Sequence, residues 1–224
     1  MKLTGDYIFE ASRDLVWDAL NDPTVLAKIM PGCEKLEQTG DNEYEGVLKI
    51  KVGPVQGAFQ GKIKLSEINA PSSYKMQVDG QGAPGFVKGV GSVQLTEQEG
   101  KTVMHYDGDA QVGGRIASVG QRLIESSAKS ITNQSLDGLH QYIKAKAAAV
   151  AAATAAADAA AAGAKSAEEA AAARQAVLAA AAAVEAPKIE APSQTQIAAT
   201  VAKDVIQDML SRVTGWMRKE TPKE

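Results

Sequence analysis

The residue types that most often carry enzyme chemistry are few in this chain, and their spacing forms no familiar catalytic arrangement. Cys33 is the only cysteine, in a Pro-Gly-Cys sequence, and both histidines, His105 and His140, lie far from it along the chain. A nucleophilic cysteine needs a nearby base or positive charge that favours its thiolate. We therefore interpret Cys33 as a small apolar thiol at the end of a helix.

The sequence also lacks the usual binding motifs for metals and phosphates. No pair of carboxylates forms a readable acid–base motif, and no His/Cys spacing is typical of a metal site. The stretch GQGAPGFVKGVG does not lie between a strand and a helix, as a dinucleotide-binding loop must. Alternation along a strand predicts that His105 points outward, and His140 is expected on the solvated side of a late helix. We expect a protein that is not an enzyme and has no intrinsic cofactor or metal.

Wide apolar side chains recur where they could line a ligand pocket. Such pockets are built mainly from apolar and aromatic side chains with few polar groups. Leu26 and Met30 are candidates for a lid, and the wall candidates are Phe59, Met76, Phe86, Met104, Tyr106, Val119 and Leu123. Every one of these residues also has the spacing of an ordinary core residue. The sequence therefore leaves a ligand cavity and a filled core both open.

The pattern of residues predicts an α+β domain over residues 1–144. An opening strand is followed by a helix that Ser12 can cap, and Asp22-Pro23 breaks it before a second short helix ending at Pro31-Gly32. Period-two alternation then predicts about five antiparallel strands between residues 44 and 112. From Gly114 the period becomes helical, and Ile116, Val119 and Leu123 begin a helix of about 30 residues. A curved sheet around one long helix would bury these faces.

The composition changes near Tyr142 and divides the chain into three parts. Residues 145–192 are mostly alanine and form a linker arm, and residues 193–224 hold a terminal amphipathic segment. A fully helical arm from Tyr142 to Glu185 would reach about 65 Å, and Pro187 and Pro192 would end it in a hinge. A frayed linker is the alternative, because alanine offers little surface for packing.

The segment from Ile197 to Met217 is predicted to bind a membrane surface or a groove on a partner protein. On a helical wheel its apolar residues share one half, with basic residues at the edges and after it. The residues assigned to membrane binding are Val201, Val205, Ile206, Met209, Leu210, Val213, Trp216, Met217, Lys203, Arg212, Arg218 and Lys219.

The bulk properties exclude some classes of protein. The formal net charge of -3 argues against nonspecific nucleic-acid binding. The N-terminus lacks the apolar run of a signal peptide, and a single cysteine suits a reducing compartment. We expect a cytoplasmic protein, peripheral on the inner face of the cytoplasmic membrane.

Several stretches resemble the CoxG family, named for the G subunit of carbon monoxide dehydrogenase, within the SRPBCC (START and Bet v 1-type) helix-grip superfamily. The resemblance spans residues 1 to about 143 and rests on VWDALNDPTVLAKIMPGCEKLE, VGPVQGAFQGKIKL, GQGAPGFVKGVGSVQL and QVGGRIASVGQRLIES. It implies a helix-grip fold, with a curved antiparallel sheet around a long C-terminal helix and a deep apolar cavity between them.

The resemblance also implies an accessory role beside a molybdenum-containing CO dehydrogenase or related hydroxylase at the membrane. The resulting hypothesis is a carrier that takes a respiratory quinone such as menaquinone, or another lipid, from the membrane and presents it to that enzyme. A quinone ring would stack on an aromatic side chain, and Tyr106 could donate its hydroxyl to a quinone carbonyl. The alternatives are a recruitment adaptor with an empty cavity and, least favoured, an enzyme acting on a hydrophobic substrate.

Overall fold

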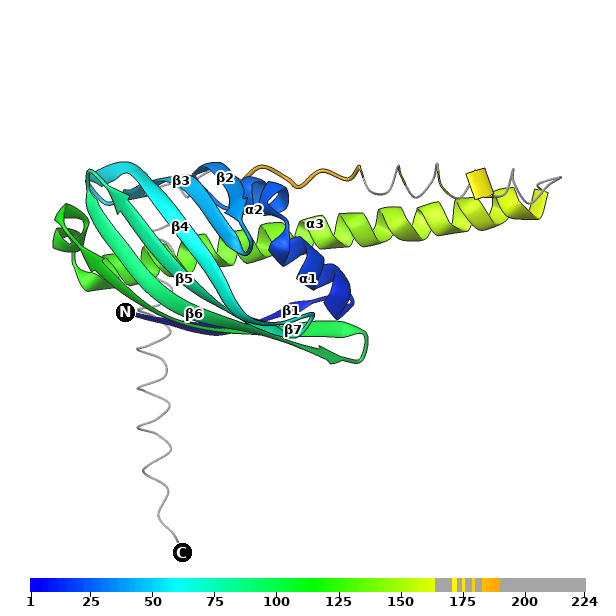
Figure 1. The fold of residues 1–224 in the computed structure, drawn as a ribbon, viewed down its shortest axis with the longest axis horizontal. Coiled ribbons are helices and arrows are strands. Elements are labelled where there is room, and N and C mark those ends of the chain that lie inside the picture. The colour runs from blue at the N-terminus through cyan, green and yellow to red at the C-terminus, as the bar shows by residue number, and fades with distance from the viewer. Residues whose placement is uncertain (164–170, 173–174, 176–178, 180–182, 190–224) are drawn as a thin grey trace, which may run out of the picture.

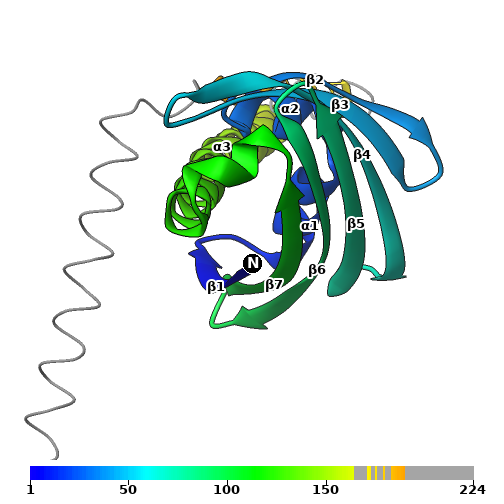
Figure 2. The same ribbon diagram turned by 90° about the vertical axis from the view of Figure 1, so that its left-hand side faces the viewer.

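The structure, a computed structural model, describes residues 1–163, 171–172, 175, 179 and 183–189. One seven-stranded antiparallel sheet wraps around one long helix (Figures 1 and 2). The strand order is β1-β7-β6-β5-β4-β3-β2. The strands are β1 (Lys2–Phe9), β2 (Cys33–Gly40), β3 (Glu43–Val52), β4 (Val55–Asn69), β5 (Ser73–Gly82), β6 (Gly85–Gln98) and β7 (Lys101–Gly113). The predicted fold class, a curved sheet around a long helix, is confirmed.

Two short helices connect β1 to β2. They are α1 (Arg13–Asn21) and α2 (Pro23–Ile29). Ser12 stands at the N-cap of α1 but makes no side-chain capping bond, whereas the Asp22 carboxylate accepts hydrogen bonds from the Thr24 and Val25 amides at 2.8 and 3.4 Å. Pro23 suits the first helical position because its missing N–H would have no partner there.

β2 is a strand that the sequence pattern did not predict. Its sequence, CEKLEQTG, has one large apolar residue, Leu36, among charged and polar ones, so no period-two alternation is visible. β2 is an edge strand that pairs only with β3 and carries two register shifts. Pairing with β3, rather than its own residue pattern, therefore makes this segment a strand.

The long helix begins later and runs further than predicted. Ile116 and Val119 lie in a separate 3-10 helix, η1 (Arg115–Val119), which Gly120 at φ 94° separates from α3 (Gln121–Gly163). α3 has 43 residues and continues without a break from the globular part into the alanine-rich stretch. At about 1.5 Å per residue it is about 65 Å long.

The chain then returns to the globular part. Residues 184–189, called here the return segment, are not helical, and Val184, Ala186 and Ile189 pack against the core. They lie beside α2 in Figure 1. One continuous helix from Tyr142 to Glu185 is therefore wrong, because the chain must reverse between Gly163 and Val184. Residues 193–224, with every residue assigned to membrane binding, lie outside the described residues.

The core consists of two apolar clusters. The first, called here the α2-end cluster, joins α1, α2 and the middle of α3 to β1, β6 and β7, and includes Phe9, Val16, Ile29, Leu95 and Leu139. The second, the η1-end cluster, centres on Val52, Phe59 and Ile116. Between them, the sheet carries inward-facing residues that belong to neither cluster, such as Ile63 and Val78.

Candidate functional site

The candidate site is the interior between the sheet and α3, bounded by the two apolar clusters. The alternation of each strand decides which residues face it. Phe59 and Leu65 belong to clusters that include residues of α3, so the odd-numbered positions of β4 face inward. The same argument assigns the even-numbered positions of β5 and β7, through Tyr74 and Met104.

Three inward-facing glycines form what we call the glycine floor: Gly61 on β4, Gly80 on β5 and Gly108 on β7. A methyl group at Gly61 would meet only the Gly46 carbonyl oxygen, 4.0 Å away. At Gly80 and Gly108 the nearest atoms would be carbonyl oxygens of neighbouring strands, each at 3.6 Å. No atom of α3 lies within 4 Å of any of these positions. A methyl group at any of the three positions would therefore not touch α3.

Residues around the glycine floor keep part of their surface accessible although they face inward. Ile63 and Val78 are paired across β4 and β5, are only half-buried, and belong to neither apolar cluster. By contrast, Phe59 and Met104, in the clusters at either end, are each 4% exposed. Closed ends with partly accessible apolar residues between them suit a site for a hydrophobic ligand.

The helix wall of the interior carries a polar stripe between two apolar stretches. Ser126, Ser127 and Ser130 are buried, after Leu123 of the η1-end cluster and before Leu136 of the α2-end cluster. Ser126 donates to backbone carbonyls of α3, and Ser130 accepts from Gln134 at 3.2 Å.

Ser127 differs from the other two serines. It is 2% exposed, and its hydroxyl has no hydrogen-bond partner in the described structure. It follows Leu123 by about one helical turn, so both lie on the same face of α3. A buried hydroxyl without a partner loses free energy, but protein atoms cover this one, so a ligand carbonyl would reach it only after those atoms move.

The structure brings most of the predicted pocket residues to the interior, in two groups. Phe59, Val119 and Leu123 lie together in the η1-end cluster. Leu26, Met76, Met104 and Tyr106 lie in or against the α2-end cluster. Met30 caps the C-terminus of α2, is half-buried and belongs to neither cluster. No ligand tests these assignments.

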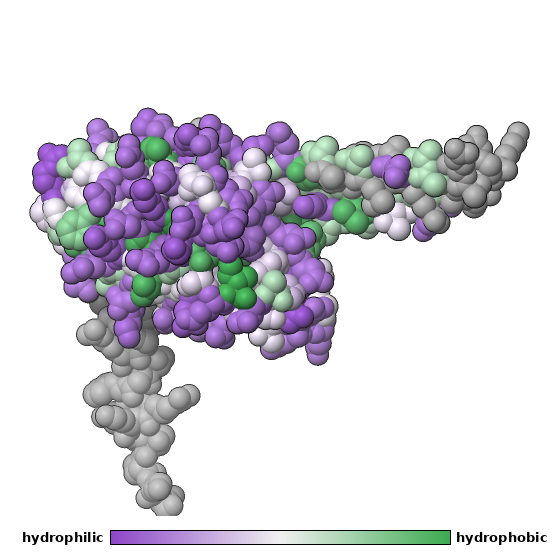
Figure 3. Space-filling model, in the orientation of Figure 1, coloured by the Kyte–Doolittle hydropathy of each residue, from purple (hydrophilic) through white to green (hydrophobic). Residues whose placement is uncertain are grey.

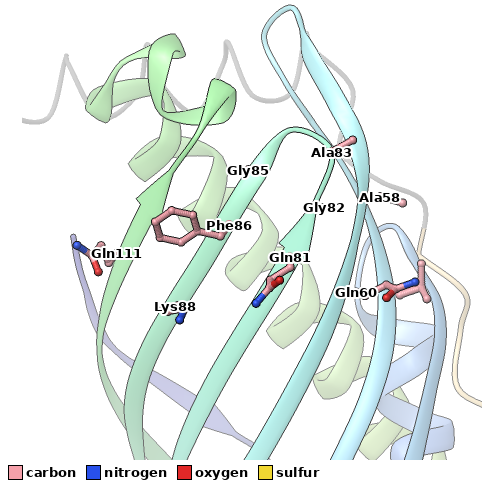
Figure 4. Close-up of a pocket in the computed structure, with 10 residues that line it drawn as sticks. Ala58, Gln60, Gln81, Gly82, Ala83, Gly85, Phe86, Lys88 and Gln111 are labelled. Atoms are coloured by element: carbon pink, nitrogen blue, oxygen red, sulfur yellow. The ribbon is translucent and has the colours of Figure 1, made fainter.

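Phe86 is not part of the interior. It is even-numbered on β6, where the odd-numbered Val93 and Leu95 face inward, and its exposed ring lies over Gly113 of β7. Phe86 instead borders an open depression of about 890 Å³ on the outer face of the sheet (Figure 4). Its other lining side chains are mostly amides, lysine and alanine, namely Gln60, Gln81, Gln111, Lys88, Ala58 and Ala83. This open surface does not enclose a ligand.

Sequence reasoning missed Ile63, Val78 and Ser127 as site residues. Ile63 has the same parity as Phe59, and Ser127 is four residues after Leu123, so both could have been found from spacing. That the glycines leave open space, rather than only curving the sheet, required the positions of α3.

The outer face of the sheet is a lattice of paired charges, visible as the hydrophilic surface in Figure 3. Six lysines of β2 to β6 lie within 4 Å of a carboxylate, in the pairs Lys35–Glu37, Lys49–Glu34, Lys62–Glu45, Lys64–Glu43, Lys75–Glu67 and Lys88–Asp79. In these pairs positive and negative charges balance.

The possible chemical residues do not form a catalytic group in the described structure. Burial raises the pKa of the Cys33 thiol, which donates to the Lys35 carbonyl at 3.5 Å. This keeps the thiol protonated and disfavours a nucleophile. His105 is exposed beside Asp6 at 2.7 Å, as predicted. In the described residues no three metal-ligand side chains cluster together, and no helix has the length and apolar character needed to cross a bilayer.

His140 corrects a prediction. It was expected on the solvated side of α3, but its ring stacks on Phe9 at 6.0 Å between centroids and meets the edge of Tyr7 at the same distance. The helix is covered on more than one side, so a position outside the main apolar stripe still packs against β1.

Comparison with known proteins identifies the family. The CoxG family, described as the G subunit of carbon monoxide dehydrogenase, matches residues 5–144, more than half of the chain. The chain belongs to the CoxG family. No curated protein matches it.

Solved structures agree with the fold. A conserved protein from Geobacillus kaustophilus is 32% identical to this CoxG-family chain, with a TM-score of 0.62, and the alignment covers 64% of this chain and 95% of the other. TTHA0849 from Thermus thermophilus is 11% identical, with a TM-score of 0.51, over 65% of this chain and 98% of the other. This CoxG-family chain has the predicted helix-grip fold, with a curved antiparallel sheet around a long C-terminal helix. The family and fold suggest an accessory role with a hydrophobic ligand.

Proposed function

We propose that this protein is a noncatalytic, membrane-tethered carrier that binds a respiratory quinone and delivers it between the membrane and a molybdenum CO dehydrogenase-type oxidoreductase. The observation that carries the proposal is the lack of α3 contacts at the glycine floor, which lies between two apolar clusters. The family name supports the enzyme partner. The tether rests on the amphipathic pattern of residues 197–217.

The chemistry of the interior favours a quinone over a plain hydrocarbon. A quinone has a flat ring, two carbonyl acceptors and an apolar tail. The small residues of the glycine floor leave room beside the sheet, and the Ser127 hydroxyl can donate to one carbonyl once the atoms that cover it move. Apolar walls such as Ile63 and Val78 suit the isoprenoid tail.

Filling the interior tests the proposal. Gly61→Val adds side-chain volume where no atom of α3 lies within 4 Å of the new Cβ. The variant is expected to fold with unchanged or slightly higher stability, since valine also has the better strand propensity. Native mass spectrometry with organic extraction, on protein expressed in a quinone-producing bacterium, should find a stoichiometric quinone in the unmodified protein and little in Gly61→Val.

Ala58→Val is the matched control, because it adds a similar side chain to the outer face of the same strand. It should retain the quinone. A ligand-free unmodified protein that still binds the oxidoreductase and lipid vesicles would overturn the carrier and support a recruitment adaptor. Turnover of a hydrophobic substrate without any partner would support an enzyme.

A further inference from the structure

The return segment follows the alanine-rich arm and is attached to one place on the globular part. The Ile189 amide donates to the Lys28 carbonyl at 2.8 Å, and Lys28 forms an ion pair with Glu185 at 3.3 Å. Lys28 is in the last turn of α2, whose final carbonyls have no partner within the helix. The return segment therefore caps α2.

Ile189 also fits between α2 and α3. A methyl group at Gly138 of α3 would lie 2.1 Å from the Ile189 Cδ1 atom and 3.3 Å from the Ile29 Cβ atom. Glycine is unfavourable inside a helix compared with alanine, but here it leaves the space that Ile189 occupies. Ala186, 8% exposed, belongs to the same cluster. The backbone hydrogen bond, the ion pair and the apolar contacts thus hold the return segment in one docked position.

This docking changes how far the terminal segment can move from the protein. If the chain left the core at Ile143 and did not return, the 54 residues to Ile197 could extend to roughly 190 Å. Docking at Ile189 places Ile197 only eight residues further along the chain, a separation of at most about 29 Å whatever the conformation. The arm is therefore a loop that returns to the globular part. The tether that links the globular part to the terminal segment is short and begins at α2.

We propose that the α2 side of the protein is the face that meets the lipid bilayer. This inference rests on the membrane tether in the proposed function. It adds that the tether turns the α2 end of the interior toward the membrane. A tether of at most about 29 Å from α2 favours orientations with α2 near the lipid, because the effective concentration of a tethered site falls with tether length. α2 carries Leu26 and Ile29 of the cluster that closes this end of the interior.

α2 is also a short helix whose stability depends on its packing contacts. It has seven residues and lies between Asp22-Pro23 and Pro31-Gly32. A helix of two turns is marginal without its packing partners. Segments with low local stability are the ones that open for ligands. Ligand exchange with the bilayer therefore takes place at the α2 end.

Fluorescence quenching on vesicles tests the orientation. In full-length protein with Cys33→Ser, a single cysteine is introduced at Thr24→Cys on α2 or at Ser118→Cys on η1, at the other end of the interior (Figure 1). Both positions are exposed. Each is labelled with a fluorophore and mixed with phosphatidylcholine–phosphatidylglycerol vesicles that carry a nitroxide headgroup. Quenching should be several-fold stronger at Thr24→Cys.

The return segment is tested in the same experiment. Ile189→Asp removes the apolar contact and should reduce the difference between the labels, because the tether lengthens. Ile68→Asp, at an isoleucine that is 38% exposed, should leave the difference unchanged. Equal quenching of the two labels, stronger quenching at Ser118→Cys, or a difference that survives Ile189→Asp would each overturn the inference.

Vesicle co-sedimentation separates this inference from the proposed function. Full-length protein that does not sediment with vesicles would overturn the tether and the orientation together, while quinone extraction would still report on the carrier. Protein that sediments but shows no difference between the labels would overturn the orientation alone.

Discussion

At the scale of single residues, small side chains shape the interior between the sheet and α3. Gly61, Gly80 and Gly108 leave space on the sheet, and Ser127 leaves a hydroxyl without a partner on the helix. Larger residues at the same positions would join the two apolar clusters into one core. The site is therefore defined by small residues as much as by the aromatic and aliphatic side chains around it.

Ser127→Ala is expected to weaken quinone binding about tenfold, since one hydrogen bond contributes about 1–1.5 kcal/mol. Stability should change by less than about 0.5 kcal/mol, because no protein hydrogen bond is lost. Titration of apo-protein with a short-tailed quinone, followed by tryptophan fluorescence, measures the affinity. Ser126→Ala is the control, because the Ser126 hydroxyl is already bonded to backbone carbonyls. Equal effects of both variants would contradict the role of Ser127.

Tyr74 predicts a loss of stability at alkaline pH. Its ring packs against Trp17 of α1 at 5.6 Å, and burial raises its pKa above the ordinary value of 10.0. Above about pH 10 the unfolded chain releases this proton while the folded protein retains it. The unfolded state is therefore favoured, and the free energy of unfolding falls as the pH rises through this range.

Urea unfolding between about pH 8 and pH 11 measures this slope. Tyr74→Phe should make it shallower, although Tyr7 and Tyr106, whose pKa values are also raised by burial, keep part of it. A slope that is the same in Tyr74→Phe would assign the alkaline instability to the other groups.

At the scale of elements, α2 and the strands around it depend on neighbours more than on their own sequences. α2 has seven residues, with the Asp22 cap at one end and the return segment at the other. β2 exists because β3 pairs with it. Both elements are short, and both lie at the end of the interior that the return segment covers.

Asp22→Ala is expected to destabilise the protein by about 1 kcal/mol, the usual effect of losing an N-cap. Amide exchange in residues 24–30 should accelerate more than exchange in α3. Ser12→Ala is the matched control, because Ser12 holds the N-cap position of α1 without a side-chain capping bond. An equal effect at both positions would mean that the Asp22 bonds do not stabilise α2.

At the scale of the whole molecule, the composition suggests a globular part, then an arm, then a terminal segment at the far end of that arm. The structure instead brings the chain back to the globular part before the terminal segment begins. α3 carries the chain away from the body, and the return segment brings it back to α2 (Figure 1). The CoxG-family match ends at residue 144, so the return segment lies beyond what the match covers.

Two truncations separate the return segment from the terminal segment. A chain ending at Ile189 should keep the thermal midpoint of the full chain and lose vesicle binding. A chain ending at Ala183 also loses Val184, Ala186 and Ile189, and apolar burial of this size is worth about 2 kcal/mol. The midpoint should then fall by roughly 4–8 °C. Calorimetry and vesicle co-sedimentation measure the two effects.

Unchanged vesicle binding in the chain ending at Ile189 would show that residues 190–224 are not the membrane anchor. An unchanged midpoint in the chain ending at Ala183 would show that the docked return segment adds no stability.

The sequence by itself determined the fold class, the order of most elements, and the family. Period-two and helical patterns persist wherever one face of an element is buried, so they are legible without coordinates. The glycine-rich and Pro-Gly stretches that carry the resemblance are local features. Most of the apolar residues predicted for the pocket do lie at the interior, because core spacing and pocket spacing are the same.

The tertiary structure alone decided which of those residues border open space and which are packed. The glycine floor makes no contact with α3, and the Ser127 hydroxyl has no partner among the described residues, because both facts depend on how α3 lies against the sheet. Phe86 faces outward because of its parity on β6. It also decided the course of the arm. Alanine has high helix propensity but too little surface to specify a packing partner, so only the contacts of Ile189 with α2 and α3 reveal that the chain returns.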